Sequence, residues 1–278
     1  MWRQILTFTV FYSVATMALA DRNEGLSAFQ RKDYGRALTE LASPAAAGDA
    51  DAAYLLGVMY GKGWGTLADP ARAARWYQKA AAQGHAKAAH NLAVMYREGD
   101  GVTEDQTKAR EWFELAANHG SAKSAQMLGL LYFKGEGVSR DYKAARDWWQ
   151  RAFTGNEPDA GYNLGILYRR GLGVNQNLAT AAKYWQLAAE KGSLMSQNTL
   201  GMAYESGEGV KQNTVTALGW YQLAARHGLQ IAAQNAALLA SRLSAAEQAE
   251  ALQFAQAKEA KMLKHSTNSA PHLESGRE

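Results

Sequence analysis

The feature that most constrains this chain is a repeat of 36 residues that runs through most of its length. The tyrosines of the repeat are Tyr60, Tyr96, Tyr132, Tyr168 and Tyr204, and the leucines four positions before them are Leu56, Leu92, Leu128, Leu164 and Leu200. Two glycine columns and an aromatic pair keep the same spacing, and no insertion interrupts the five units. Such a pattern predicts a stack of similar modules, each packed on its neighbours, rather than a domain around one central core.

The residue types within one unit predict a helix, a turn and a second helix. Leu56 and Tyr60 lie four residues apart, so they share the core-facing side of a first helix over residues 51–60. Gly63 and Gly65 form a turn that suits positive φ angles. The second helix begins at a capping Asp or Asn and ends at a Gly or Asn. The caps are Asp69, Asp105, Asp141, Asn177 and Asn213, and the end residues are Gly84, Gly120, Asn156, Gly192 and Gly228.

The aromatic pairs keep a constant place on the second helix, where an inward stripe is expected to pack in the core. The pairs are Trp76-Tyr77, Trp112-Phe113, Trp148-Trp149, Tyr184-Trp185 and Trp220-Tyr221. We therefore interpret them as core residues and not as a surface that stacks on sugars or bases. The fold class that follows is all-α, an α-solenoid of antiparallel helix pairs.

Both ends of the repeat array predict caps. Asp33 and Gly48 lie 36 residues before Asp69 and Gly84, so a partial unit precedes the five, and a capping box at Ser244 opens a last helix that ends near Leu263. The predicted divisions are a signal peptide (1–20), an N-terminal capping half-repeat (21–48), five repeats (49–228), C-terminal capping helices (229–263) and a disordered tail (264–278).

The first twenty residues are typical of a secretory signal peptide. Arg3 gives a positive start, an apolar stretch without acidic residues follows, and Ala18-Leu19-Ala20 has the small-x-small pattern of a cleavage site. The apolar stretch is short for an uncleaved membrane anchor. We expect cleavage after Ala20, a periplasmic mature chain with secretion as the alternative, and no stable membrane insertion after cleavage.

The composition argues against catalysis. The chain has no Cys, which excludes disulfides, cysteine nucleophiles, cysteine-bound zinc and a lipoprotein anchor. The net charge of +4 comes from 30 basic and 26 acidic residues without a basic run, so no nucleic-acid partner is expected. Common hydrolase and phosphate-binding motifs are absent, and His119 and His227 suit the negative end of a helix dipole. We predict no enzyme activity, no metal and no cofactor.

The motif L-G-x-x-Y-x-x-G-x-G-V, followed by an aromatic pair and A-A-x-x-G, resembles the Sel1-like repeat, a relative of the tetratricopeptide repeat. One copy contains Leu164, Tyr168, Gly171, Gly173 and Val174, and the similarity covers residues 49–228. The resemblance implies a right-handed superhelix of helix pairs that acts as an adaptor or regulator in protein complexes. It implies no particular partner.

In such a superhelix the first helices line the concave face, so we predict binding residues among their outward positions. Asn91 and Asn163 precede the motif leucine and resemble the asparagine by which some tetratricopeptide domains hydrogen-bond a peptide. Positive charge follows the tyrosine in three units, at Arg97, Lys134 and Arg169-Arg170, and would favour an acidic segment. The predicted set is Tyr54, His90, Asn91, Arg97, Gln126, Phe133, Tyr162, Asn163, Arg169 and Arg170.

These observations favour a non-catalytic scaffold or regulator of the bacterial cell envelope, a monomer that holds a protein or peptide in its groove. Two alternatives stay open. One is an envelope enzyme of the β-lactamase or cell-wall hydrolase type, although the related secreted proteins with that label are rich in paired cysteines. The other is a secreted factor that binds host proteins.

Overall fold

The computed structural model describes residues 21–268, and every regular element in that range is an α-helix. The predicted signal peptide and the last ten residues of the predicted tail lie outside the described residues. The chain divides into two compact units at Arg140, and each is described by itself.

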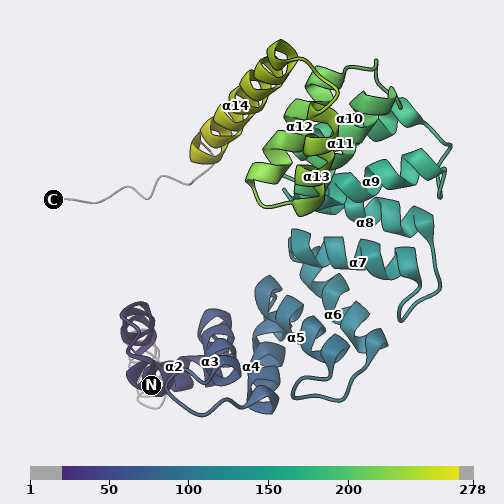
Figure 1. Ribbon diagram of the computed structural model, residues 1–278. Coiled ribbons are helices and arrows are strands. Elements are labelled where there is room, and N and C mark those ends of the chain that lie inside the picture. The colour runs from purple at the N-terminus through teal and green to yellow at the C-terminus, as the bar shows by residue number, and fades with distance from the viewer. Residues whose placement is uncertain (1–20, 269–278) are drawn as a thin grey trace, which may run out of the picture. The chain divides into compact units, whose positions relative to one another are not determined.

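Unit 1 contains a helix over residues 21–30 and six further helices (Figure 1). These are α2 (Tyr34–Ala46), α3 (Ala50–Lys62), α4 (Pro70–Ala82), α5 (Ala86–Glu98), α6 (Gln106–Asn118) and α7 (Ala122–Lys134). Unit 2 contains α8 (Tyr142–Thr154), α9 (Pro158–Arg170), α10 (Leu178–Glu190), α11 (Leu194–Ser206), α12 (Thr214–Arg226), α13 (Gln230–Ala240) and α14 (Ala245–Asn268). The odd-numbered helices from α3 to α13 are called first helices, and the even-numbered helices from α2 to α12 second helices.

The predicted caps begin every second helix from α4 to α12. Asp69 Oδ1 accepts a hydrogen bond of 2.8 Å from the backbone N–H of Arg72, and the equivalent Asp and Asn residues do the same. The backbone N–H of Asp69 in turn donates to the carbonyl of Tyr60 at 2.8 Å. The same residue therefore closes the turn from the first helix and starts the second.

The two glycines of the turn have different tasks. The first helix α5 ends at Gly99, whose φ of 70° is left-handed, as predicted for a helix end. A β-carbon on Gly101 would lie 2.3 Å from the carbonyl carbon of Pro70, at the start of the preceding second helix. The second glycine therefore lets each turn rest on the backbone of the repeat before it. Asn156 adopts a φ of 69° in place of a terminal glycine, which confirms the prediction for that position.

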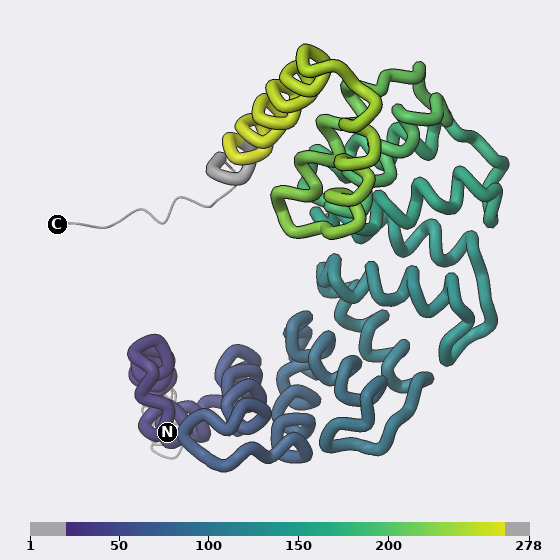
Figure 2. The backbone as a smooth tube through the Cα atoms, in the orientation of Figure 1, coloured from purple at the N-terminus to yellow at the C-terminus, as the bar shows by residue number. Residues whose placement is uncertain are grey.

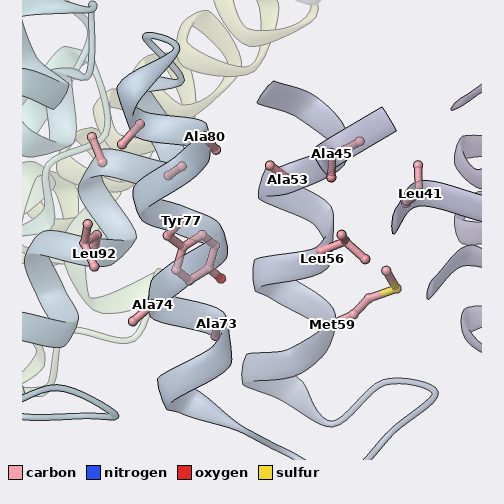
Figure 3. Packing of buried hydrophobic residues seen from close by; sticks show 14 of the residues in the cluster. Leu41, Ala45, Ala53, Leu56, Met59, Ala73, Ala74, Tyr77, Ala80 and Leu92 are labelled. Atoms are coloured by element: carbon pink, nitrogen blue, oxygen red, sulfur yellow. The ribbon is translucent and has the colours of Figure 1, made fainter. Parts of the chain in front are cut away.

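In the pairs α3–α4, α9–α10 and α11–α12, a large ring of the second helix packs against a glycine of the first helix. A β-carbon on Gly57 would lie 2.5 Å from the Tyr77 ring, and one on Gly165 would lie 2.1 Å from Trp185 Nε1. Figure 3 shows Tyr77 in this core, with Leu41 and Leu56 on neighbouring helices. The second member of each aromatic pair is buried, as predicted.

The first members of the aromatic pairs are less buried than predicted. Trp76 and Trp148 are half-buried, and Lys79 Nζ and the Arg151 guanidinium lie 4.4 Å and 4.5 Å from their ring centroids. Trp112 and Tyr184 are also half-buried, whereas Trp220 is fully covered. These rings lie at the edge of the core, where a cation over the ring adds stabilisation.

The last helix, α14, packs along α12 and forms the yellow end of the tube in Figure 2. It extends to Asn268, past Leu263, where the predicted capping helices end. Phe254 meets Trp220 edge-on at 5.5 Å between centroids, and a β-carbon on Gly219 would lie 2.5 Å from the Phe254 ring. The other second helices of the five repeats have exposed charged residues in the column of Gly219, namely Arg75, Glu111, Asp147 and Lys183. The glycine in the last repeat therefore creates the docking surface for α14.

Replacing Gly219 with Lys, the residue type of this column in α10, should detach α14 from α12. The long side chain cannot fit against Phe254 and the Ala251 carbonyl, and overpacking of this kind costs about 1–3 kcal/mol. Hydrogen exchange should show loss of protection in residues 245–264 while α9 and α10 keep theirs. Glu111→Lys places the same residue at the equivalent exposed position of α6 and should leave α14 protected. Unchanged protection of α14 in Gly219→Lys would contradict this account of its docking.

Two half-buried histidines make the stability of unit 1 depend on pH. His85 Nδ1 accepts a 3.1 Å hydrogen bond from the backbone N–H of Ala88, so the neutral ring caps α5. His90 Nδ1 lies 2.8 Å from the Ser124 Oγ of the next repeat. Burial lowers the pKa of both rings below 6.5, with the charge of Lys123 adding to the effect at His90 and that of Asp51 opposing it at His85.

We therefore expect unit 1 to lose stability as the pH falls below about 6.5, the pKa of a histidine in an unfolded chain. Below that pH the two histidines bind protons in the unfolded chain but stay neutral in the folded chain. The free energy of unfolding therefore decreases until the pH reaches the lowered pKa values of the folded chain. Urea unfolding at pH 7.5 and pH 5 would measure the decrease. The variant His85→Asn with His90→Gln, which keeps a capping group and a polar partner for Ser124, should reduce it. An equally large decrease in that variant would rule out these two rings as the cause.

Candidate functional site

The outward side of the first helices has a different chemistry in the two units. In unit 1 this side is charged. Its exposed residues at the start and end of α3, α5 and α7 are Asp51, Lys62, Lys87, Glu98, Lys123 and Lys134. In unit 2 the column of Asp51, Lys87 and Lys123 becomes apolar on the last two first helices, α11 and α13, where it holds Met195 and Ile231.

Four large apolar side chains on α11 and α13 are exposed to solvent. They are Met195 (40%), Met202 (47%), Ile231 (49%) and Leu238 (63%), and we call them the apolar strip. Met195 and Ile231 occupy one column of the repeat, and Met202 and Leu238 occupy another. The two helices are linked by a 2.9 Å hydrogen bond from Asn235 Nδ2 to Asn198 Oδ1, so the strip continues from one helix to the next.

A hollow of about 540 Å³ lies beside the apolar strip within unit 2. Met202 borders both, and the indole of Trp185 and the ring of Tyr221 contribute to the wall of the hollow. The remaining lining residues are mainly polar and come from α9, α11 and α13 and from the turn after α11. They are Arg169, Thr199, Ala203, Glu205, Ser206, Glu208 and Asn235.

The charges around this hollow are paired. Arg169 binds Glu208 through two contacts, Nε to Oε1 at 2.6 Å and Nη2 to Oε2 at 3.1 Å. Glu205 accepts a 3.0 Å hydrogen bond from the Tyr221 hydroxyl and lies 3.4 Å from Arg242 Nη2. Burial and the hydrogen bond to Glu205 raise the pKa of the Tyr221 hydroxyl, which stays protonated as a donor. A ligand here would meet a fixed polar rim beside an apolar strip, without an unpaired charge to attract it.

The residues predicted for binding in unit 1 mostly hold neighbouring repeats together. The Tyr54 ring stacks on His85 at 4.4 Å between centroids. Asn91 hydrogen-bonds the Tyr77 hydroxyl, whose pKa burial raises to about 12. Arg97 pairs with Glu98 at 2.7 Å and reaches Met127 Sδ of the next first helix at 3.9 Å.

The other residues predicted in unit 1 are His90, Gln126 and Phe133, and all three are half-buried. His90 is bonded to Ser124, as described above. The structure therefore places Tyr54, His90, Asn91 and Arg97 at contacts between repeats, and only parts of these side chains face solvent.

The predicted residues of unit 2 differ from one another in exposure. Tyr162 packs against the core, and its carbonyl accepts a 3.2 Å hydrogen bond from Trp185 Nε1. Asn163 is half-buried, and Arg170 is exposed at the end of α9. Arg169 is the one member of the predicted set that lines the hollow.

The apolar strip was not predicted, because the predicted binding residues came from the two columns just before the motif leucine and from the positions just after the motif tyrosine. The signal is present in the sequence. The column of Asp51, Lys87, Lys123 and Asp159 changes to Met195 and Ile231 in the last two first helices. A change from charge to large apolar residues at an outward position marks a surface that differs from the rest of the array.

Among the described residues, no group of three or more His, Asp or Glu side chains is arranged to hold a metal ion. In residues 21–268, no helix is both long enough and apolar enough to cross a membrane.

Comparison with known proteins identifies the repeat. A family model described as Sel1 repeat matches residues 50–85, 86–121, 122–156, 158–193 and 194–229. These limits agree with the five units seen in the sequence and with the five helix pairs from α3 to α12. No curated protein sequence matches this chain.

Two solved structures show the same architecture. A Sel1 repeat protein from Oxalobacter formigenes is 33% identical, with a TM-score of 0.73, over 75% of this chain and 86% of that one. The protein c5321, described as a protective antigen present in uropathogenic Escherichia coli strains, is 32% identical, with a TM-score of 0.79. That match covers 92% of this chain and 56% of the longer c5321 chain. The predicted fold of stacked helix pairs is confirmed, and the chain belongs to the Sel1-repeat family, whose members generally act as non-catalytic scaffolds for protein interactions.

Proposed function

We propose that this chain is a non-catalytic interaction module of the bacterial cell envelope that binds a protein partner on the outward side of its first helices. The observation that carries the proposal is the apolar strip of Met195, Met202, Ile231 and Leu238. Soluble proteins rarely leave adjacent large apolar side chains in water unless the surface binds something. Methionine side chains are flexible and polarisable, so they suit a surface that adapts to its partner.

The hollow beside the strip supplies the polar part of the same surface. The Arg169–Glu208 fork and the Glu205–Tyr221 pair form its rim, while Thr199 and Asn235 line it as well. An apolar centre with a polar, hydrogen-bonding edge is the usual composition of a protein interface. We infer that the partner places apolar side chains on the strip and backbone or neutral polar groups in the hollow, because the charges there are already paired.

The strip predicts which substitutions reduce binding. Met195→Glu with Met202→Glu should lower the affinity for a captured envelope protein by about 2 kcal/mol, or roughly 30-fold, because two carboxylates then face the apolar side chains of the partner. The measurement is quantitative mass spectrometry of proteins retained from envelope extract by immobilised chain 21–278, followed by titration of each retained protein. Leu67→Glu, at a side chain that is 88% exposed in a turn of unit 1, is the matched control.

The sequence-predicted set provides the competing assignment. The variant Asn91→Ala, Asn163→Ala, Arg169→Ala and Arg170→Ala should reduce retention less than the double Met variant does. If the double Met variant retains partners as well as the unaltered chain does, while the fourfold Ala variant loses them, the apolar strip is not the binding surface. Circular dichroism should show the same helical content in all variants.

The envelope location rests on the sequence of residues 1–20 and is part of the proposal. Expression of the full chain with fractionation should place it in the periplasmic extract, and its first residue should be Asp21. Replacing Ala18 and Ala20 with Lys should prevent cleavage and leave a longer chain that is retained with the membrane. Recovery mainly from the culture medium would support the alternative of a secreted factor, a possibility in line with the description of c5321 as a protective antigen.

A further inference from the structure

In α3, α5, α9 and α11, a face of mainly small residues packs against the second helix of the same repeat. This face contains the columns of Ala53 and Gly57, and every equivalent residue from α3 to α11 is buried. The residues are Ala53 and Gly57, Ala89 and Ala93, Ala125 and Gly129, Gly161 and Gly165, and Gln197 and Gly201. Tyr77, Trp185 and Tyr221 each pack on their own repeat's residue of the second column.

The same face of α13 is uncovered. Its residues in the two columns are Ala233 and Ala237, and both are exposed. The reason is the position of α14, which packs along α12 and not along α13. Only residues 241–244 connect α13 to α14, and Gln248 Nε2 holds the junction by donating to the carbonyls of Ala240 and Leu243 at 3.0 Å each. The second-helix position of the last repeat is therefore vacant.

The composition of α13 is that of a covered helix. Its sequence from Gln230 to Ala240 contains no charged residue, whereas α3, α5, α7, α9 and α11 each contain at least one. The last element of a solenoid is expected to have a polar outer side, because no further repeat covers it. Instead, the exposed side of α13 consists mainly of Ala233, Ala237 and the bordering Ile231 and Leu238, with Gln234 between them.

We propose that this face of α13, centred on Ala233 and Ala237, is a docking site for one α-helix of a partner protein, and that this helix carries a large aromatic side chain on its contact side. The chain itself provides the precedent, because in three repeats the equivalent face accepts a helix whose buried Tyr or Trp packs on it, namely Tyr77, Trp185 and Tyr221. Two alanines four residues apart leave a shallow depression along the helix, into which a ring can pack.

The segments of this chain itself are poor occupants of the site. Phe254, Lys258 and Glu259 hold α14 on the second helices through Trp220, Glu190 and Arg226. Residues 269–278 contain no Tyr, Phe or Trp, so they lack the aromatic side chain that the proposed occupant carries. The occupant is therefore expected from another protein. On α13 this site adjoins Ile231 and Leu238 of the apolar strip, but the proposal does not depend on the function proposed above.

A second helix of this chain can serve as the probe. A fluorescent peptide of residues 177–192, stapled on its outward side because a free helix of this length is barely stable, should bind chain 21–278 with 1:1 saturation in fluorescence anisotropy. The same peptide with Trp185→Ala should bind at least tenfold more weakly. Ala237→Arg in the protein should also weaken binding at least tenfold, because the guanidinium fills the depression.

Controls separate this site from other surfaces. Ala257→Arg, at an exposed alanine of α14, and the double Met195→Glu, Met202→Glu variant should bind the peptide as the unaltered chain does. No saturable binding, or binding that Ala237→Arg leaves unchanged, would overturn the proposal. Sedimentation analysis gives a second test, since a dimer abolished by Ala237→Arg would show that another copy of this chain covers the face. If removal of residues 269–278 strengthens peptide binding tenfold, the tail is the occupant and the proposal also fails.

Discussion

The packing of one large ring against one small residue is the interaction on which each repeat depends. Tyr77 on Gly57, Trp185 on Gly165 and Tyr221 on Gly201 bring two helix backbones close enough to exclude water from the pair. A single pair of helices cannot bury its remaining apolar side, so it needs the next pair. The second turn glycine makes that contact, since its lack of a β-carbon allows the turn to rest on the preceding second helix. The periodic sequence is thus the consequence of two recurring close contacts: a ring against a glycine of the first helix, and the second turn glycine against the preceding second helix.

Much of this arrangement could be predicted from the sequence because the residues act locally. Asp69 accepts a hydrogen bond three residues away, and Asn156 adopts the left-handed conformation expected of a terminal residue. Such features depend on a few neighbouring positions and need no knowledge of the fold. The course of α14 could not be predicted in the same way. The capping box at Ser244 shows where the helix starts, but its direction depends on Gly219 meeting Phe254, two residues that are 35 positions apart in the sequence and in no shared motif.

The candidate surface was harder to predict, because exposure depends on neighbours that one helix does not reveal. Asn91 and Arg97 have the residue types of a binding groove, yet Asn91 bonds Tyr77 and Arg97 reaches Met127 of the next repeat. Polar residues in these columns therefore contribute to the contact between repeats. The outward columns were better indicators. In the column that holds Lys87 and Lys123, the last two first helices have Met195 and Ile231, which makes the surface more hydrophobic. A partner that covers those side chains would account for the change.

The end of the array shows how the same residues can have two roles. Inside the array, small residues in the columns of Ala53 and Gly57 are buried, and a ring packs on the glycine of the second column in three repeats. At α13 the same columns are exposed because α14 packs on α12, where Phe254 contacts Gly219 and Trp220. A chain that needed only a cap could have placed charged residues in α13, as the outward columns of unit 1 do. The absence of charge along the whole of α13 suits a helix that is covered in the working complex, so the last repeat is best understood as an interface that another molecule completes.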